Sequence, residues 1–347
     1  MQVAALTVAV GLALAVAGAQ ARDAAATSRP TATPSACAAA RAVAYLLAAQ
    51  NSDGGFGAAP GQPSNELYSG WAALGLAAAG RELTTVSRGP GLLAYVRDGS
   101  NPDPGSVERT ILVLRAAGEP ALAGGHDLIA ALERDIRSDG SIAQQVNWTS
   151  FAVLALRAAG VAPAPRMLGW IVAQQNRDGG FSFGSAGDPS DPDDTGAALE
   201  ALAGDSTATA VRARGRAVAY LRAVQDRDGG FASQPGEGSN AQSTAWAVQG
   251  LVAAGVAPAS VRRDGGPSPL AYLVSLAAPD GSIRYARGQA QTPVWVTGEA
   301  LMALEDRPLP LAAPHVTARV SGSLDTAYLA GAIGLAEALA LALAGLG

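Results

Sequence analysis

The chain of 347 residues contains little cysteine, histidine, aromatic residue and charge. Its only cysteine, Cys37, has no partner within the chain, which excludes an intrachain disulfide framework. Charged residues make up 15% and hydrophobic residues 49%, a balance that excludes a disordered chain and favours a large buried interior. The net charge is −5 and basic residues form no cluster, so we expect no nucleic-acid partner. Alanine is abundant and aromatic residues are sparse, which favours closely packed helices over strands.

Both ends of the chain are apolar. Residues 1–21 combine an apolar run with a small-residue cleavage site, which is typical of a secretory signal peptide, and residues 22–35 have the composition of a flexible spacer. Residues 326–347 form a second apolar run, long enough to cross a bilayer. The sequence therefore predicts an extracytoplasmic protein, secreted or held at the cell surface, with 307–325 as a stalk before a membrane anchor. The alternative for the last segment is a helix packed on the domain.

A motif, Gln-x-x-Asp-Gly-Gly-Phe, occurs three times, starting at Gln50, Gln175 and Gln225. Each copy follows an apolar run and precedes, after a polar loop, an Ala- and Leu-rich run that ends in glycine, the expected helix cap. Weaker Asp-Gly copies fill the gaps and give six units across residues 36–306. Six helical hairpins predict an all-α fold, an α/α toroid with an inner and an outer ring of helices.

The loop motif has a mechanical interpretation. Paired glycines permit positive φ where the chain reverses, and the aspartate can accept hydrogen bonds from the amides of the turn. Phe56, Phe181 and Phe231 can then fill the space between neighbouring hairpins. We therefore expect the motif to be structural.

This repeated motif resembles the hallmark of the prenyltransferase/squalene-cyclase repeat superfamily, and the resemblance covers about residues 36–306. It implies an α/α toroid, but that fold serves terpene cyclases, protein prenyltransferases, vitamin carriers and thioester domains alike. A zinc prenyltransferase needs an Asp/Cys/His set, whereas the single Cys37 precedes the first repeat. A Gly-Cys-Gly-Glu-Gln thioester sequence does not occur either. The sequence implies no metal and no cofactor.

Large aromatic side chains gather where the inner helices are expected to begin. Six helix N-termini at one mouth would also create a positive potential suited to anionic groups. We therefore expect a pocket there that holds a small hydrophobic or anionic molecule. Its candidate ligand-binding residues are Trp71, Trp148, Phe151, Trp246 and Trp295.

One unit carries an acidic cluster that its siblings lack, Asp191-Pro-Asp193-Asp194-Thr195. It resembles the Asp-x-Asp-Asp-Thr motif of squalene-hopene cyclase and other class II terpene cyclases. The resemblance implies that Asp193 protonates an alkene or epoxide while Asp191 and Asp194 modulate its acidity. Two other interpretations remain open at this point: aspartates that cap a helix, and a Ca²⁺ site, although the spacing matches no EF-hand loop.

The first expectation for function is non-catalytic: an exported, surface-anchored toroid that binds a small molecule or a partner at the rim. Class II cyclases normally have two helical domains and aromatic-rich cavities, and neither histidine, His126 or His315, lies near the acids in sequence. The alternative is a class II terpene-cyclase-like enzyme that uses Asp191–Asp194 for protonation-initiated cyclisation. A third possibility is a carbohydrate-active toroid with two opposed carboxylates, drawn from Glu66, Glu108, Glu299 and Asp193.

Overall fold

The computed structural model describes residues 32–234 and 236–313. The predicted signal peptide, most of the spacer, the later part of the stalk and the membrane anchor lie outside these residues. Within the described ranges, no helix is both long enough and apolar enough to cross a membrane.

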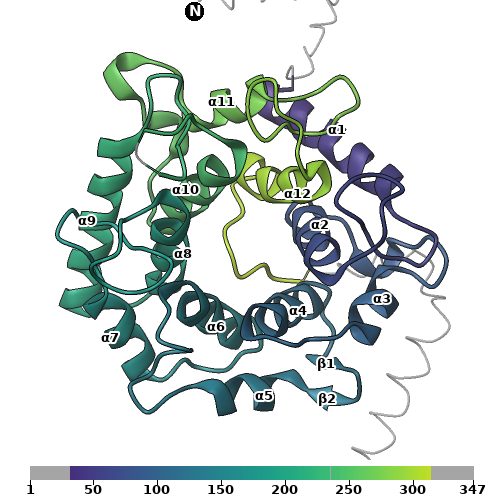
Figure 1. Ribbon diagram of the computed structural model, residues 1–347, viewed down its shortest axis with the longest axis horizontal. Coiled ribbons are helices and arrows are strands. Elements are labelled where there is room, and N and C mark those ends of the chain that lie inside the picture. The colour runs from purple at the N-terminus through teal and green to yellow at the C-terminus, as the bar shows by residue number, and fades with distance from the viewer. Residues whose placement is uncertain (1–31, 235, 314–347) are drawn as a thin grey trace, which may run out of the picture. The chain divides into compact units, whose positions relative to one another are not determined.

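Twelve α-helices in the described residues alternate between an outer and an inner ring (Figure 1). The outer helices are α1 (Pro34–Ala49), α3 (Leu92–Asp98), α5 (Leu128–Asp135), α7 (Pro165–Ala173), α9 (Ala208–Val224) and α11 (Pro269–Ser275). The inner helices are α2 (Glu66–Ala78), α4 (Pro104–Ala116), α6 (Val146–Ala158), α8 (Pro192–Leu202), α10 (Ala241–Ala253) and α12 (Pro293–Leu304). The predicted all-α toroid of six hairpins is confirmed.

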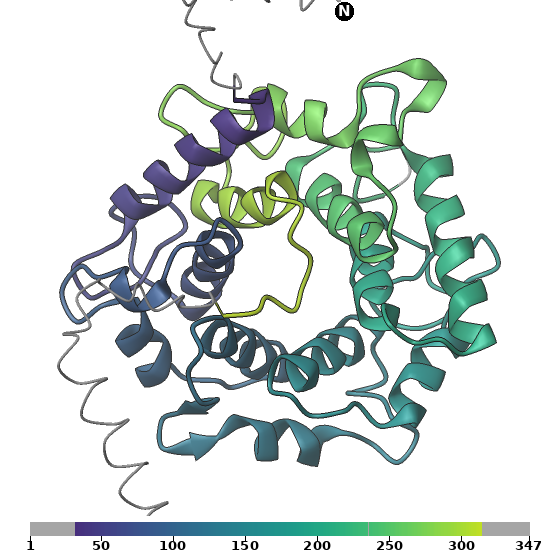
Figure 2. The same ribbon diagram turned by 180° about the vertical axis from the view of Figure 1, so that it is seen from behind.

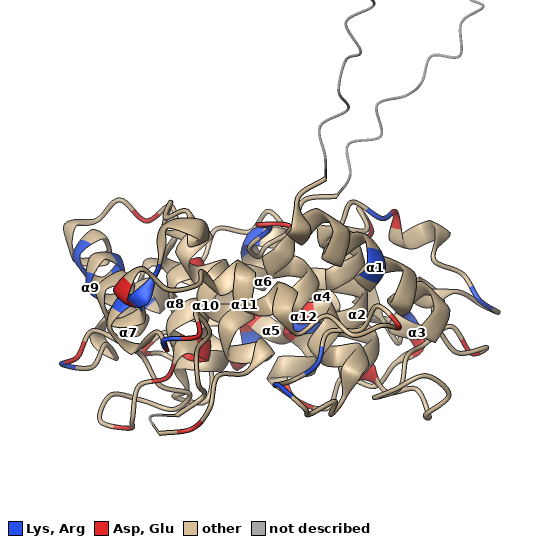
Figure 3. Ribbon diagram, turned by 90° about the horizontal axis from the view of Figure 1, so that it is seen from above, with Lys and Arg blue, Asp and Glu red and all other residues tan. Residues whose placement is uncertain are grey.

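The ring is closed, because α12 packs against both α1 and α2 (Figure 2). Beside the helices, the described residues contain a short antiparallel hairpin of β1 (Leu122–Ala123) and β2 (His126–Asp127). They also contain three 3₁₀ turns in outer connections, η1 (Leu83–Thr85), η2 (Pro258–Ser260) and η3 (Arg263–Gly265). Acidic and basic residues are interspersed along the ribbon of the ring, as Figure 3 shows.

The repeated loop motif turns the chain from an outer helix to an inner one. In the copy before α8, the Gln175 amide donates to the carbonyl of Gly179 at 2.8 Å, and Asp178 accepts from the amide of Gly180. Gly179 has φ +96°, and a Cβ on Gly180 would lie 2.6 Å from the side chain of Ser190, so each glycine is required. The motif phenylalanines Phe56, Phe181 and Phe231 are completely buried, so the structural interpretation of the motif is confirmed.

A hydroxyl in the first turn of each inner helix except α4 fixes the loop that precedes it. Thr195 in α8 accepts a hydrogen bond from the amide of Phe181 at 2.9 Å. Ser69, Thr149, Thr244 and Thr297 make the same contact in their own repeats. These contacts hold the starts of five of the six inner helices against the loops that precede them.

The opposite end of the ring is covered by the chain after α12. Leu309 and Leu311 are buried, and the amide of Leu309 donates to Oε1 of Glu200 in α8 at 2.7 Å. Residues 307–313 therefore belong to the toroid, which corrects the predicted start of the stalk at residue 307. Two apolar leucines make this short stretch a base for the ring, whereas its prolines had suggested an extended stalk.

Candidate active site

The acidic cluster forms the start of α8. Asp191 is the N-cap: its Oδ1 accepts from the amide of Asp194 at 2.7 Å, and Pro192 occupies the first helical position, where no N–H is needed. Oδ1 of Asp194 accepts from Nδ2 of Asn147 in the neighbouring α6, also at 2.7 Å. The capping interpretation is thus right for Asp191. Capping does not explain why Asp193 stands in this turn.

Asp193 is the member of the cluster that has the free oxygen. Its Oδ1 is shielded from solvent and has no hydrogen-bond partner, although the residue as a whole is only half-buried. Burial raises the pKa of Asp193 to about 7; the charge of Asp194 acts in the same direction and the Ser243 hydroxyl in the opposite one. A carboxylic acid with this pKa keeps its proton near neutral pH.

The pKa values of Asp191 and Asp194 depend on each other. Burial raises the pKa of both side chains, and the charges of Asp194 and Asp193 raise the pKa of Asp191 further. The hydrogen bond between the two carboxyls raises the pKa of Asp191 and lowers that of Asp194, as Asn147 does. This hydrogen bond therefore favours the proton on Asp191 over the proton on Asp194.

Three of the predicted aromatic residues meet at the centre of the ring. Trp71 of α2, Phe151 of α6 and Trp246 of α10 come from alternate inner helices and contact one another edge to face. Their ring centroids are 5.4 to 6.0 Å apart. Such rings present π faces that attract cations.

The other two predicted aromatic residues lie nearer the mouth. Trp148 lines a cavity of about 480 Å³ over the starts of α2, α4 and α6. Trp295 contacts Tyr68, with ring centroids 6.2 Å apart, and its indole N–H donates to Glu299 at 2.7 Å.

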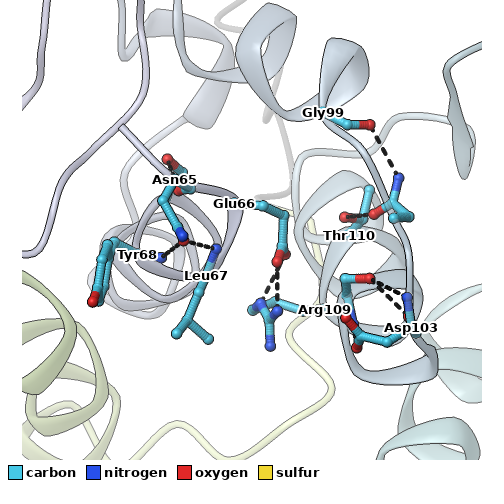
Figure 4. Close-up of polar contacts among 11 residues, drawn as sticks. Asn65, Glu66, Leu67, Tyr68, Gly99, Asp103, Arg109 and Thr110 are labelled. Carbon is cyan, nitrogen blue, oxygen red and sulfur yellow. Dashed lines mark hydrogen bonds and ion pairs between the residues drawn. The ribbon is translucent and has the colours of Figure 1, made fainter. Parts of the chain in front are cut away.

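The cavity has one polar wall. Arg109 of α4 forms a bidentate pair with Glu66 of α2, with Nε donating to Oε1 at 2.8 Å, as Figure 4 shows. The Arg109 guanidinium also lies 5.7 Å from the ring centroid of Trp71. Asn147 reaches this cavity as well, so the residue that holds Asp194 also lines the cavity. Asp194 therefore stands directly behind one wall of this cavity.

Glu108 also lines the cavity, but it has a different character. It is 1% exposed, and neither carboxyl oxygen has a hydrogen-bond partner. Burial raises its pKa well above the usual range, and the charge of Arg109 lowers it. Glu108 is therefore a neutral acid in the wall.

Two features of the site were not predicted from the sequence. These are the Glu66–Arg109 pair and the contact of Asn147 with Asp194. Asn147 occupies in its own repeat the place that Asp193 has in the next one, and this alignment is the signal that could have found it. Within residues 32–234 and 236–313, no group of three or more His, Cys, Asp or Glu side chains is placed to hold a metal ion.

A family model, the prenyltransferase alpha-alpha toroid domain, matches residues 29–190 and 195–293. The chain belongs to this family. The two matched stretches leave out residues 191–194, which are the acidic cluster.

Among curated proteins, a drimenyl diphosphate synthase from Streptomyces showdoensis is 31% identical over 212 residues. The match covers 54% of this chain and 40% of the relative, so the chain spans less than half of the relative's length. Among solved structures, the type II terpene cyclase MstE from Scytonema, in complex with its substrate geranylgeranyl dihydroxybenzoate, matches with a TM-score of 0.58 and 15% identity. A glycosidase matches with a TM-score of 0.56 and 15% identity. At such identities the structural matches establish the fold and leave the chemistry to the residues.

These comparisons correct the first expectation for function. A non-catalytic binding protein is the wrong interpretation, because the relative found at 31% identity is by name a drimenyl diphosphate synthase, and the matching solved structure is by name a type II terpene cyclase. The argument that a class II cyclase normally has two helical domains also fails. The match with MstE covers 97% of that chain and 79% of this one, so a single toroid of this size accounts for nearly all of a terpene cyclase chain.

Proposed function

We propose that this protein is a class II terpene cyclase in which Asp193 donates the proton that starts cyclisation of a linear isoprenoid chain. The observation that carries the proposal is the unpartnered, shielded Oδ1 of Asp193, beside the carboxyls of Asp191 and Asp194. A carboxylic acid that protonates an alkene must be protonated at the working pH, and its O–H must not be held in a hydrogen bond to a neighbouring acceptor.

The chemistry follows from this arrangement. The carboxyl O–H of Asp193 transfers its proton to one carbon of a terminal alkene or epoxide, and the bond that breaks leaves a carbocation at the adjacent carbon. The next double bond of the chain attacks this cation, which closes a ring and moves the charge along the chain. The faces of Trp71, Phe151 and Trp246 stabilise the positive charge in the lumen.

The substrate's polar end is assigned to the cavity lined by Arg109, Glu66 and Glu108. A hydrophobic substrate agrees with the isoprenoid substrate of MstE. The name of the Streptomyces relative raises a diphosphate head group as one candidate.

The test compares the wild type with Asp193→Asn on squalene, oxidosqualene, farnesyl diphosphate and geranylgeranyl diphosphate, with products identified by gas chromatography–mass spectrometry. The wild type is expected to form a cyclised product from at least one substrate. Asp193→Asn is expected to lose about 100-fold or more of this rate, the contribution typical of a positioned general acid.

Asp127→Asn is the matched control, since Asp127 caps the outer helix α5 and is exposed. It replaces the same type of side chain with the same amide and should retain the wild-type rate. A folded Asp193→Asn protein that cyclises as fast as the wild type would contradict the proposal.

A further inference from the structure

A second buried carboxyl lies near Asp193. Glu299 of α12 is 1% exposed, and each of its oxygens accepts a hydrogen bond at 2.7 Å, Oε1 from the indole of Trp295 and Oε2 from the amide of Gln242. Its place in α12 corresponds to that of Trp71, Phe151 and Trp246 in their own helices. The side chain therefore stands at the level where the aromatic rings meet.

The first turn of α10 connects Glu299 with Asp193. The Gln242 amide donates a hydrogen bond to Glu299. The hydroxyl of the next residue, Ser243, forms a hydrogen bond with Asp193 that lowers the pKa of Asp193. The two carboxyls are close enough for the charge of Asp193 to raise the pKa of Glu299. The two acids thus lie on α8 and α12, the two inner neighbours of α10.

Their hydrogen-bond partners differ, although burial raises the pKa of both side chains to about 7. Both oxygens of Glu299 accept from N–H groups, which stabilise the ionised form, whereas Oδ1 of Asp193 accepts from nothing. Burial raises the pKa of Glu299 to about 7, and the hydrogen bonds of Gln242, Trp295 and Trp246 act in the opposite direction. Hydrogen bonds to both oxygens favour the ionised form of Glu299, which makes it the better proton acceptor of the two, and the unpartnered oxygen makes Asp193 the better donor.

We propose that Glu299 is the base that ends the cyclisation by taking a proton from the final carbocation. This rests on the proposed cyclase function. The carbon next to the cationic centre loses its proton to a carboxylate oxygen of Glu299, the C–H electron pair becomes a new double bond, and Glu299 becomes neutral. Asp193 has meanwhile become a carboxylate, so the overall reaction is an isomerisation. Exchange with water between turnovers returns a proton to Asp193 and removes one from Glu299.

The other buried glutamates of the described chain do not fit this role. Glu108 has no N–H donor on either oxygen and is neutral. Glu200 lies at the base of the ring, where Oε1 holds the amide of Leu309. Of these three glutamates, only Glu299 accepts a hydrogen bond on each carboxyl oxygen and also lies near Asp193 and the aromatic rings.

The experiment compares the wild type, Glu299→Gln and Glu305→Gln on squalene and geranylgeranyl diphosphate in D₂O. Glu305 ends the same helix and is exposed, which makes it the matched control. Glutamine at 299 still accepts from Trp295, and the Gln242 amide can turn its oxygen toward the new NH₂ group. Substrate consumption and the shares of cyclic alkene and cyclic alcohol are measured, with deuterium located by mass spectrometry.

Glu299→Gln is expected to keep consuming substrate and to incorporate one deuterium at the initiating carbon, because Asp193 is intact. The share of the wild-type alkene should fall about tenfold or more, replaced by alkene isomers and water-captured alcohols. Glu299→Asp, which retains a carboxylate, should keep the wild-type alkene as its main product. Glu305→Gln should match the wild type.

An unchanged product mixture in folded Glu299→Gln would overturn the role of Glu299 while leaving the cyclase function in place. A slower reaction with the same products would also overturn it, since that is the result of a purely structural defect. If the wild type consumes neither substrate, both proposals fall.

Discussion

The helices α4 and α8 both begin with an aspartate N-cap followed by proline, yet only the start of α8 carries the residues of a candidate active site. Asp103 and Asp191 are both N-caps followed by proline, and each accepts a hydrogen bond from the amide three residues later. In α4, the next residues are Gly105 and Ser106, and the serine completes a reciprocal capping box with Asp103.

In α8, the corresponding positions hold Asp193 and Asp194. The cap at Asp103 is exposed, whereas Asp191 and Asp194 are buried. A helix start needs one acceptor, and α4 shows that the fold is satisfied without further acids. The two additional carboxyls in α8 cost desolvation energy that the fold does not require, and function accounts for such a cost.

The largest expected effect comes from removing the charge that stands beside the acid. Asp194→Asn keeps an oxygen that can accept from Asn147 but removes the negative charge that raises the pKa of Asp193. The pKa of Asp193 should therefore fall below about 7. The acid form is then lost at lower pH, so the descending limb of the pH–rate profile moves down. At pH 8 the rate should fall about tenfold for each unit by which the pKa falls. A limb that stays in place would show that Asp194 does not tune Asp193.

The next effect concerns folding. Thr195→Val in α8 leaves the buried amide of Phe181 without its acceptor, which should reduce the free energy of unfolding by about 1–3 kcal/mol in urea titrations. In α4 this position is already valine, Val107, and the loop before it has no motif phenylalanine. The reverse change, Val107→Thr, should therefore bring no gain in stability. A gain would mean that the two repeats differ less than the structure indicates.

The smallest effect separates a cap from a proton donor. Asp103→Ala should lower the free energy of unfolding by about 1 kcal/mol, the usual cost of a lost cap. Asp193→Asn should change the free energy of unfolding little at about pH 3, below the unfolded-state pKa of an aspartate, and should stabilise the protein at pH 8. Because the folded-state pKa of Asp193 is raised to about 7, its contribution is intact below the unfolded-state pKa and is lost as the pH rises through about 7. Denaturant titrations at the two pH values measure this difference, and a loss of stability at pH 8 would assign Asp193 to the scaffold.

The fold could be predicted because it repeats. Three copies of one loop motif predicted the hairpins, and the glycines and phenylalanines act as the pattern indicated. The acidic cluster was also found from the sequence, since only one of the six repeats carries it. The functional choice was wrong, because low aromatic content suggested too few rings for a cyclase. The topology brings Trp71, Phe151 and Trp246 to a single point, which composition does not reveal.

The rest depends on contacts between helices. Glu66 and Arg109 are 43 residues apart, and Gln242 and Glu299 are 57 apart, so only the closed ring pairs them. No local pattern predicts which of several glutamates will be held by two N–H donors.

The central claim is that Asp193 keeps a proton near neutral pH, and infrared difference spectroscopy of the wild type minus Asp193→Asn tests it without a substrate. We predict a protonated-carboxyl C=O band at pH 6 that belongs to Asp193 and disappears with a midpoint at about pH 7. Identical spectra in this band for the two folded proteins at pH 6 would mean that Asp193 is already ionised, and the account of α8 as a proton-donating site would be contradicted.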